Sequence, residues 1–149
     1  MNISVVVPFH WMENWQFFLD RCLKSVHSQS FKDYEIVLIK SGTMPVTTNQ
    51  AIQCAKGDLI KILFMDDYLA HDNALQEIVD NFPDDKQWLV TGCTHDKGDN
   101  VWYDYHTPYY SPDIHTGNNT IGSPSVLTMR RGSHLYFDEK LSWLLDCDL

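Results

Sequence analysis

The strongest constraint on the fold is a regular alternation of strand-like and helix-like runs through the first 93 residues. Short runs rich in Val, Ile and Leu occupy residues 3–7, 35–39 and 59–64, and a fourth begins at Trp88. Between them, apolar residues recur at helical spacing over residues 14–26, 47–56 and 72–82. Strand runs of this kind are typical of buried parallel strands. The order predicts an α/β fold with a mostly parallel central sheet and helices on its faces.

The alternation stops after Gly92. Residues 95–119 are rich in Asp, Gly, Asn and Pro and hold several Tyr and Trp residues, which predicts a long loop. Its aromatic rings suit either stacking on sugars or ordinary packing within the loop. Two further strands are predicted at residues 125–129 and 135–137, and a helix begins at residue 141.

Charge and hydropathy exclude several classes of protein. The net charge is −9, and the largest basic cluster is the pair Arg130-Arg131, so nucleic-acid binding through phosphate neutralisation is not expected. No signal peptide precedes the first strand, and the longest apolar runs are too short to span a bilayer. The four cysteines form no Cys-x-x-Cys pair, which favours reduced thiols and a soluble, cytoplasmic protein.

Polar and aromatic side chains directly follow three of the predicted parallel strands. Ligands of such sheets bind beyond the carboxyl ends of the strands, where this sequence has Phe9-His10, Lys40-Ser41 and Asp66-Asp67. The two adjacent carboxylates can bind Mg²⁺ or Mn²⁺, which prefer oxygen ligands and bridge phosphate oxygens. The alternative is structural, with Asp66 ending the strand and Asp67 capping the turn that follows.

Other motifs of catalysis and nucleotide binding are absent. The sequence has no Gly-x-Ser-x-Gly, no Gly-x-Gly-x-x-Gly and no Gly-x-x-x-x-Gly-Lys, which argues against a hydrolase, a dinucleotide-binding domain and a P-loop protein. Its seven histidines show no zinc-ligand spacing.

Several segments, in order along the chain, together resemble the family 2 glycosyltransferases. They are Ile3–Pro8, residues 25–31 and 33–39, Asn49-Gln50-Ala51-Ile52, Ala55–Ile60, Phe64–Leu69, Gly122–Leu127 with Arg130-Arg131, and Phe137–Leu141 leading to Asp146–Leu149. The resemblance covers nearly the whole chain.

The resemblance implies a GT-A fold, a three-layer sandwich in which residues 1–93 bind the nucleotide and residues 94–149 form the acceptor side. The implied reaction moves a sugar from a UDP, GDP or dTDP sugar to a hydroxyl of a glycan or other acceptor, with inversion. Carried over by position, the donor-binding residues are Pro8, Phe9, His10, Lys40, Ser41, Asn49 and Asp66. The metal ligands for Mg²⁺ or Mn²⁺ are Asp66 and Asp67, and the catalytic base is Asp146.

The sequence departs from the family pattern at three points of the implied site. Phe64 stands at the first acidic position of the Asp-x-Asp triplet, Leu145 replaces the Glu before the base, and Lys40-Ser41-Gly42-Thr43 replaces Asp-Asp-Gly-Ser. Lys40 cannot accept hydrogen bonds from a base or ribose, but it can meet a phosphate as a point charge. These departures support the alternative hypothesis, a glycosyltransferase-like domain that binds a nucleotide or sugar without turnover. A homodimer is left open.

Overall fold

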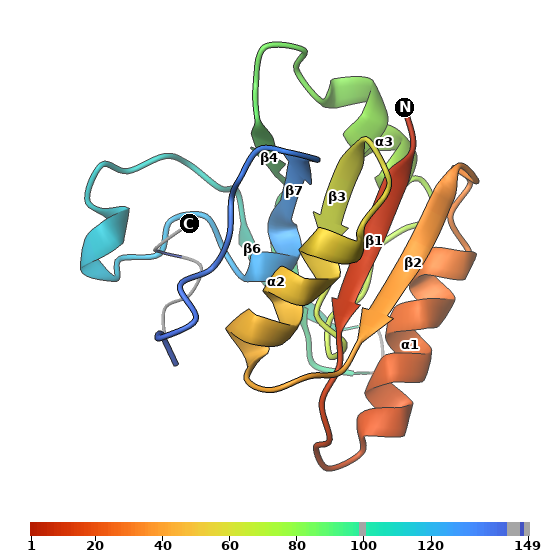
Figure 1. Ribbon diagram of the computed structural model, residues 1–149. Helices are drawn as coiled ribbons and strands as arrows, with labels where there is room; N and C mark the ends of the chain where they lie inside the picture. The colour runs from red at the N-terminus through yellow and green to blue at the C-terminus, as the bar shows by residue number, and fades with distance from the viewer. Residues whose placement is uncertain (99–100, 143–146, 148–149) are drawn as a thin grey trace.

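The computed structural model describes residues 1–98, 101–142 and 147, and it confirms the α/β fold with a mostly parallel sheet. Five strands lie side by side in the order β2-β1-β3-β7-β4 (Figure 1). They are β1 (Ile3–Pro8), β2 (Tyr34–Ile39), β3 (Leu59–Ile62), β7 (Leu127–Arg130) and β4 (Trp88–Val90). Strand β7 runs antiparallel to both of its neighbours, so the other four share one direction. The sheet therefore joins strands from both predicted halves of the chain.

Helices cover both faces of the sheet. They are α1 (Trp15–His27), α2 (Met44–Cys54) and α3 (Ala74–Asn81). One apolar cluster joins α1 and α3 to the side chains of one sheet face, and a second joins α2 to the other face. Alternate residues of β1, such as Val5 and Val6, enter opposite clusters, because successive side chains of a strand point to opposite faces.

Thr47 and Thr48 are residues that favour a helix start, but helix α2 begins three residues before Thr47. Thr43 is its N-cap residue, and Pro45 lies in the first turn, where its missing N–H costs no hydrogen bond. Gly57 follows the predicted range and is of a residue type that commonly ends a helix, but α2 already ends at Cys54. Gly57 instead allows a close approach, because a Cβ atom there would lie 2.5 Å from the backbone nitrogen of Ser4.

The region predicted as a long loop contains a second, two-stranded sheet. Strands β5 (Cys93–Asp96) and β6 (Trp102–His106) pair antiparallel, and short 3-10 helices follow at Ile114–Thr116 and Pro124–Val126. The strand predicted at residues 135–137 is not formed. The N–H of Phe137 instead donates to the side-chain oxygen of Asn49, and its C=O accepts from the side-chain amide of the same residue. Most of the helix predicted from residue 141 lies outside the described residues.

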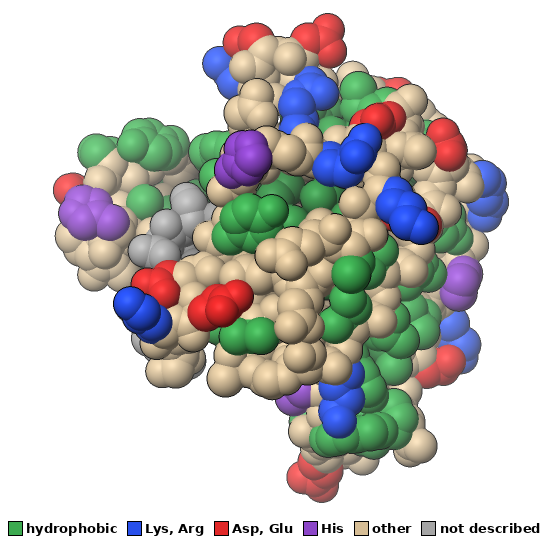
Figure 2. All heavy atoms as spheres, in the orientation of Figure 1, with side chains coloured by type: hydrophobic (Ala, Val, Ile, Leu, Met, Phe, Trp, Pro, Cys, Tyr) green, Lys and Arg blue, Asp and Glu red, His purple; other side chains and the backbone are tan. Residues whose placement is uncertain are grey.

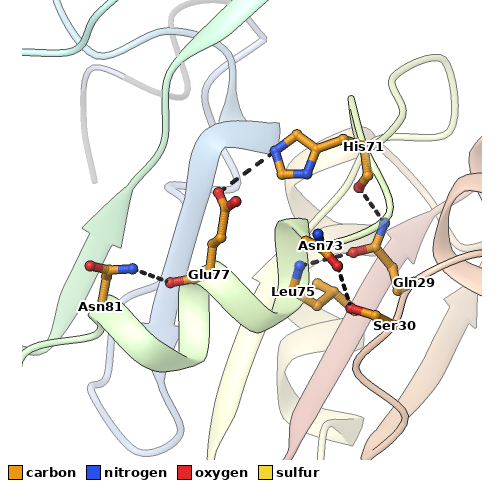
Figure 3. Close-up of polar contacts among 7 residues, drawn as sticks. All are labelled: Gln29, Ser30, His71, Asn73, Leu75, Glu77 and Asn81. Atoms are coloured by element: carbon orange, nitrogen blue, oxygen red, sulfur yellow. Dashed lines mark hydrogen bonds and ion pairs between the residues drawn. The ribbon is translucent and has the colours of Figure 1, made fainter.

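The segment that follows β3 is fastened to the end of α1 by the side chain of Gln29 (Figure 3). This side chain is fully buried; it donates to the carbonyl oxygen of His71 at 2.8 Å and accepts from the N–H of Leu75 at 2.9 Å. Ser30 adds a bond to Asn73 at 2.7 Å. Gln29 thereby satisfies a free N–H at the start of α3. Asp72, the first residue of the predicted helix, is of a type that favours capping, but the residue before the helix is Asn73, which makes no side-chain cap.

Two further features bear on the sequence-based predictions. Among the residues that the structure describes, none of the helices is both long and apolar enough to cross a membrane. The helical spacing of the sequence places both Cys22 and Cys54 on apolar helix faces; Cys22 is buried as this predicts, whereas Cys54 is exposed.

Candidate functional site

The ends of β1, β2 and β3 come together at one edge of the sheet, as the parallel pairing requires. The N–H of Phe9 donates to the carbonyl oxygen of Ile39 at 2.8 Å, which joins the ends of β1 and β2. The N–H of His10 lies 3.4 Å from the Sδ atom of Met65, beyond the end of β3. Five of the predicted donor residues, Pro8, Phe9, His10, Lys40 and Ser41, therefore lie at this edge together with Asp66.

An aromatic cluster stands just beyond β1. The rings of Phe9, Trp11 and Trp15 pack with centroids 4.5 to 5.1 Å apart. Trp11 is 59% exposed, and the Nζ atom of Lys40 lies 4.6 Å from the centre of its ring. Figure 2 shows hydrophobic side chains and a basic one together at the end of the molecule where this loop lies. A flat ring beside a cation suits a ligand with an aromatic base and a phosphate.

Asp66 and Asp67 lie in a tight turn, in which the N–H of Asp67 donates to the carbonyl oxygen of Phe64 at 2.9 Å. The side chain of Asp66 is exposed. Its backbone carbonyl accepts a hydrogen bond from Nη2 of Arg21 at 2.8 Å. The turn is thus held through its backbone, which leaves the Asp66 carboxylate facing solvent.

Asp67 occupies a different environment from its neighbour. Its carboxylate lies 3.5 Å from the hydroxyl of Ser123. Burial raises the pKa of the Asp67 carboxyl, and the side chain of Ser125, which stabilises the charged carboxylate, partly opposes this shift. Asp67 therefore connects the turn after β3 to the segment before β7.

Arg21 also joins the turn to the β5–β6 hairpin. Its guanidinium lies 4.5 Å from the ring centre of Tyr68, and its Nη1 atom lies 3.9 Å from the carboxylate of Asp96. Tyr68 donates to the same carboxylate at 2.5 Å, and Trp102 lies beside its ring. Burial, with the hydrogen bond to Asp96, raises the pKa of the Tyr68 phenol to about 12. The hairpin, which sequence analysis did not predict, thus borders the candidate site.

Asn49 is placed differently from the other predicted donor residues. Its side chain is buried, with its amide N–H bonded to the carbonyl oxygen of Phe137 at 2.8 Å and its oxygen to the N–H of the same residue at 2.9 Å. The amide group also reaches Glu139 at 3.2 Å. The contacts of Asn49 hold the chain that returns over α2. Asp146, the predicted base, lies outside the described residues.

The carboxylates at this edge suit a cation that takes most of its ligands from a bound diphosphate and from water. Within the described ranges, no three His, Cys, Asp or Glu side chains form a group that could enclose a metal. Mg²⁺ commonly binds through one or two carboxylates together with phosphate oxygens and water. The exposed carboxylate of Asp66 fits that arrangement better than Asp67, whose carboxylate faces two serine hydroxyls.

No family model matches the sequence, and no curated protein does either. Solved structures do match. The glycosyltransferase S. aureus TarS, residues 1–349, superposes on 99% of this chain with a TM-score of 0.70 and 20% identity. The chain shares its fold with a glycosyltransferase.

Two further TarS structures contain ligands. The TarS complex with UDP matches with a TM-score of 0.70, 19% identity and 99% of this chain covered. The complex with UDP-GlcNAc matches with a TM-score of 0.67 and 19% identity over 95% of this chain. This chain covers 53% of TarS 1–349 in the first complex and 50% in the second, so it spans about half of that length.

The main residues that sequence analysis missed are Arg21, Tyr68, Ser125 and Lys61, a buried lysine of β3 whose amine donates to the carbonyl oxygen of Ser125. Arg21 lies on the helix predicted correctly, yet nothing in its spacing indicates a partner at Asp66. Lys61 carried a usable signal, since it is a charged residue in the middle of an apolar strand.

Proposed function

We propose that this chain is a glycosyltransferase that moves a sugar from a nucleoside-diphosphate sugar to an acceptor hydroxyl, with inversion and with Mg²⁺ or Mn²⁺. The observation that carries the proposal is the exposed Asp66 carboxylate beside an aromatic and basic surface, at the carboxyl edge of the parallel sheet. The fold shared with TarS, which has been solved with UDP and with UDP-GlcNAc, supports a uridine nucleotide as the first donor to test.

Each part of the surface has a role in this proposal. The base stacks on the exposed ring of Trp11, next to Phe9. Lys40 approaches the diphosphate as a point charge. Asp66 holds a cation, which when bound offsets the negative charge of the leaving diphosphate. Arg21 keeps the backbone of Asp66 in place without touching the ligand.

The acceptor side of the proposal rests on the resemblance of residues 137–149 to family 2 glycosyltransferases. Asp146 removes the proton from the acceptor hydroxyl while the oxygen attacks the anomeric carbon from the face opposite the diphosphate. The bond to the diphosphate oxygen breaks in the same displacement, which inverts the anomeric centre.

A second candidate is a domain that binds the nucleotide sugar but does not turn it over. The specific observation in its favour is Phe64, which packs against the apolar cluster beneath α2 where the family pattern has a carboxylate. A site with one exposed carboxylate can bind a cation and diphosphate without completing the transfer.

Binding is tested by calorimetric titration of UDP, GDP and dTDP, each with and without Mn²⁺. We expect binding that depends on Mn²⁺ and that is lost in Asp66→Ala. Asp85→Ala is the control, because Asp85 is also an exposed acid and lies in the loop before β4. If a folded sample binds none of the nucleotides, the proposed function is wrong.

Turnover separates the two candidates. We expect slow hydrolysis of UDP-GlcNAc, followed as release of UDP, and we expect Asp146→Asn to abolish it while leaving the affinity for UDP unchanged. Nucleotide binding without any release of UDP would favour the domain that only binds.

A further inference from the structure

A lysine lies in the interior of the sheet. Lys61 is in the middle of β3, with Val5 of β1 on one side and Thr128 of β7 on the other, and it is 1% exposed. Taking an amine out of water is costly, and an apolar residue at this position would fill the core at lower cost. The fold alone therefore does not explain Lys61.

The amine of Lys61 is hydrogen-bonded to a backbone carbonyl group near the candidate site. Its Nζ atom donates a hydrogen bond to the carbonyl oxygen of Ser125, in the 3-10 helix that leads into β7. The hydroxyl of the same serine accepts from the N–H of Phe64 at 2.9 Å, and it stabilises the charged carboxylate of Asp67. Lys61 thus holds Ser125 in place, and Ser125 in turn contacts the strand end that carries the two aspartates.

Ser123 extends this connection. Its hydroxyl lies 3.5 Å from the carboxylate of Asp67, so two serines of one turn face the same side chain. Burial lowers the pKa of the Lys61 amine to about 7, and the nearby charge of Asp67 opposes that shift. Both the neutral and the charged amine can donate to the Ser125 carbonyl, so the connection does not require a particular charge state.

We propose that Lys61 is a positioning residue of the nucleotide site, which fixes the 123–125 turn from inside the sheet and thereby sets the place of Asp67 and the Asp66 turn. The role in nucleotide binding rests on the proposed function, whereas the role in fixing the turn does not. Lys61 acts through Ser125 and does not contact the ligand.

The first experiment needs no nucleotide. Lys61→Met keeps an unbranched side chain and removes the donor. We expect the Phe64 amide to exchange its hydrogen about tenfold faster in this variant, relative to the Val6 amide in the centre of the sheet. Leu59→Ala is the matched control; it removes core packing at the other end of β3 and should leave this ratio unchanged. An unchanged ratio in Lys61→Met would overturn the proposal.

The second experiment measures the affinity for UDP with Mn²⁺ in Lys61→Met, in Ser125→Ala and in the double variant. We expect each single change to weaken binding about tenfold, as loss of a supporting residue around a metal site does, and the double change to add little. Additive losses would show that Lys61 does not act through Ser125 and would overturn the proposal. If the unmodified protein binds no nucleotide, the proposed function fails, and the exchange experiment still decides whether Lys61 fixes the turn.

Discussion

The Nη2 atom of Arg21 lies 2.8 Å from the backbone carbonyl oxygen of Asp66, so helix α1 holds the turn at the end of β3 directly. The same face of the helix makes further contacts at four-residue intervals. The hydroxyl of Ser25 accepts from the N–H of Leu69 at 3.0 Å, and Gln29 follows one turn later with its bonds to the 71–75 backbone. One face of α1, with Gln29 just past its end, therefore positions the segment from Asp66 to the start of α3.

Replacing Arg21 by Met should weaken nucleotide binding and lower the free energy of unfolding by about 1–2 kcal/mol, because the variant loses a charge-assisted hydrogen bond and the cation–π contact with Tyr68. Lys24→Met, one turn away, is the control, since the side chain of Lys24 forms a surface ion pair with Asp20. Calorimetry and urea denaturation measure the two effects. Unchanged UDP affinity in Arg21→Met would mean that the turn keeps its shape without this contact.

Replacing Gln29 by Leu should destabilise the protein by roughly 2–4 kcal/mol, because the N–H of Leu75 and the carbonyl of His71 then lose their buried partner. The size of the side chain is nearly kept, so little of the loss comes from packing. Gln76→Leu is the control, because the side chain of Gln76 bonds Asp80 at the surface of α3. The test is urea denaturation. A decrease in the free energy of unfolding below about 1 kcal/mol would contradict a stabilising role for the hydrogen bonds of Gln29.

Stability should increase with pH above neutrality because of Lys61. Burial lowers the pKa of this amine from 10.5 to about 7 in the folded protein, so the unfolded chain binds more protons between these values. Folding then gains about 1–2 kcal/mol between about pH 7 and about pH 8.5. Urea denaturation of the protein and of Lys61→Met at both pH values isolates this contribution, since other titrating groups are common to both. An equal increase in the two proteins would contradict a buried, titrating Lys61.

Long periodic elements were predictable from the sequence, and exposed ones were not. The helix predicted over residues 14–26 lies at Trp15–His27, because its apolar stripe recurs over three turns. Strand β6 has exposed residues on both faces, so it shows no alternation of apolar and polar residues, and its partner β5 is short. The prediction of a strand at 135–137 was wrong because the backbone of this apolar run is hydrogen-bonded to a side chain, that of Asn49, and not to another strand.

The candidate site was predictable only where it follows directly from strand ends. Parallel pairing alone brings Phe9 and Lys40 to the edge where Asp66 lies. The supporting residues were missed because their partners are backbone carbonyls far along the chain, 45 residues away for Arg21 and 64 for Lys61. Every residue has a carbonyl group, so even where a residue such as Lys61 stands out in the sequence, its partner does not.

Replacing Trp11 by Ala should weaken the binding of UDP by about ten- to a hundredfold, since stacking of a base on an aromatic ring contributes about 1–3 kcal/mol. The same change removes the ring beneath the Lys40 amine, whose Nζ lies 4.6 Å from its centre. Tyr109→Ala is the matched control, because that ring is similarly exposed, at 62% against 59%, and lies on a loop outside the aromatic cluster beyond β1. The measurement is calorimetric titration of UDP with Mn²⁺. Equal losses in both variants would place the base elsewhere, whereas a loss confined to Trp11→Ala would identify the surface on which it stacks.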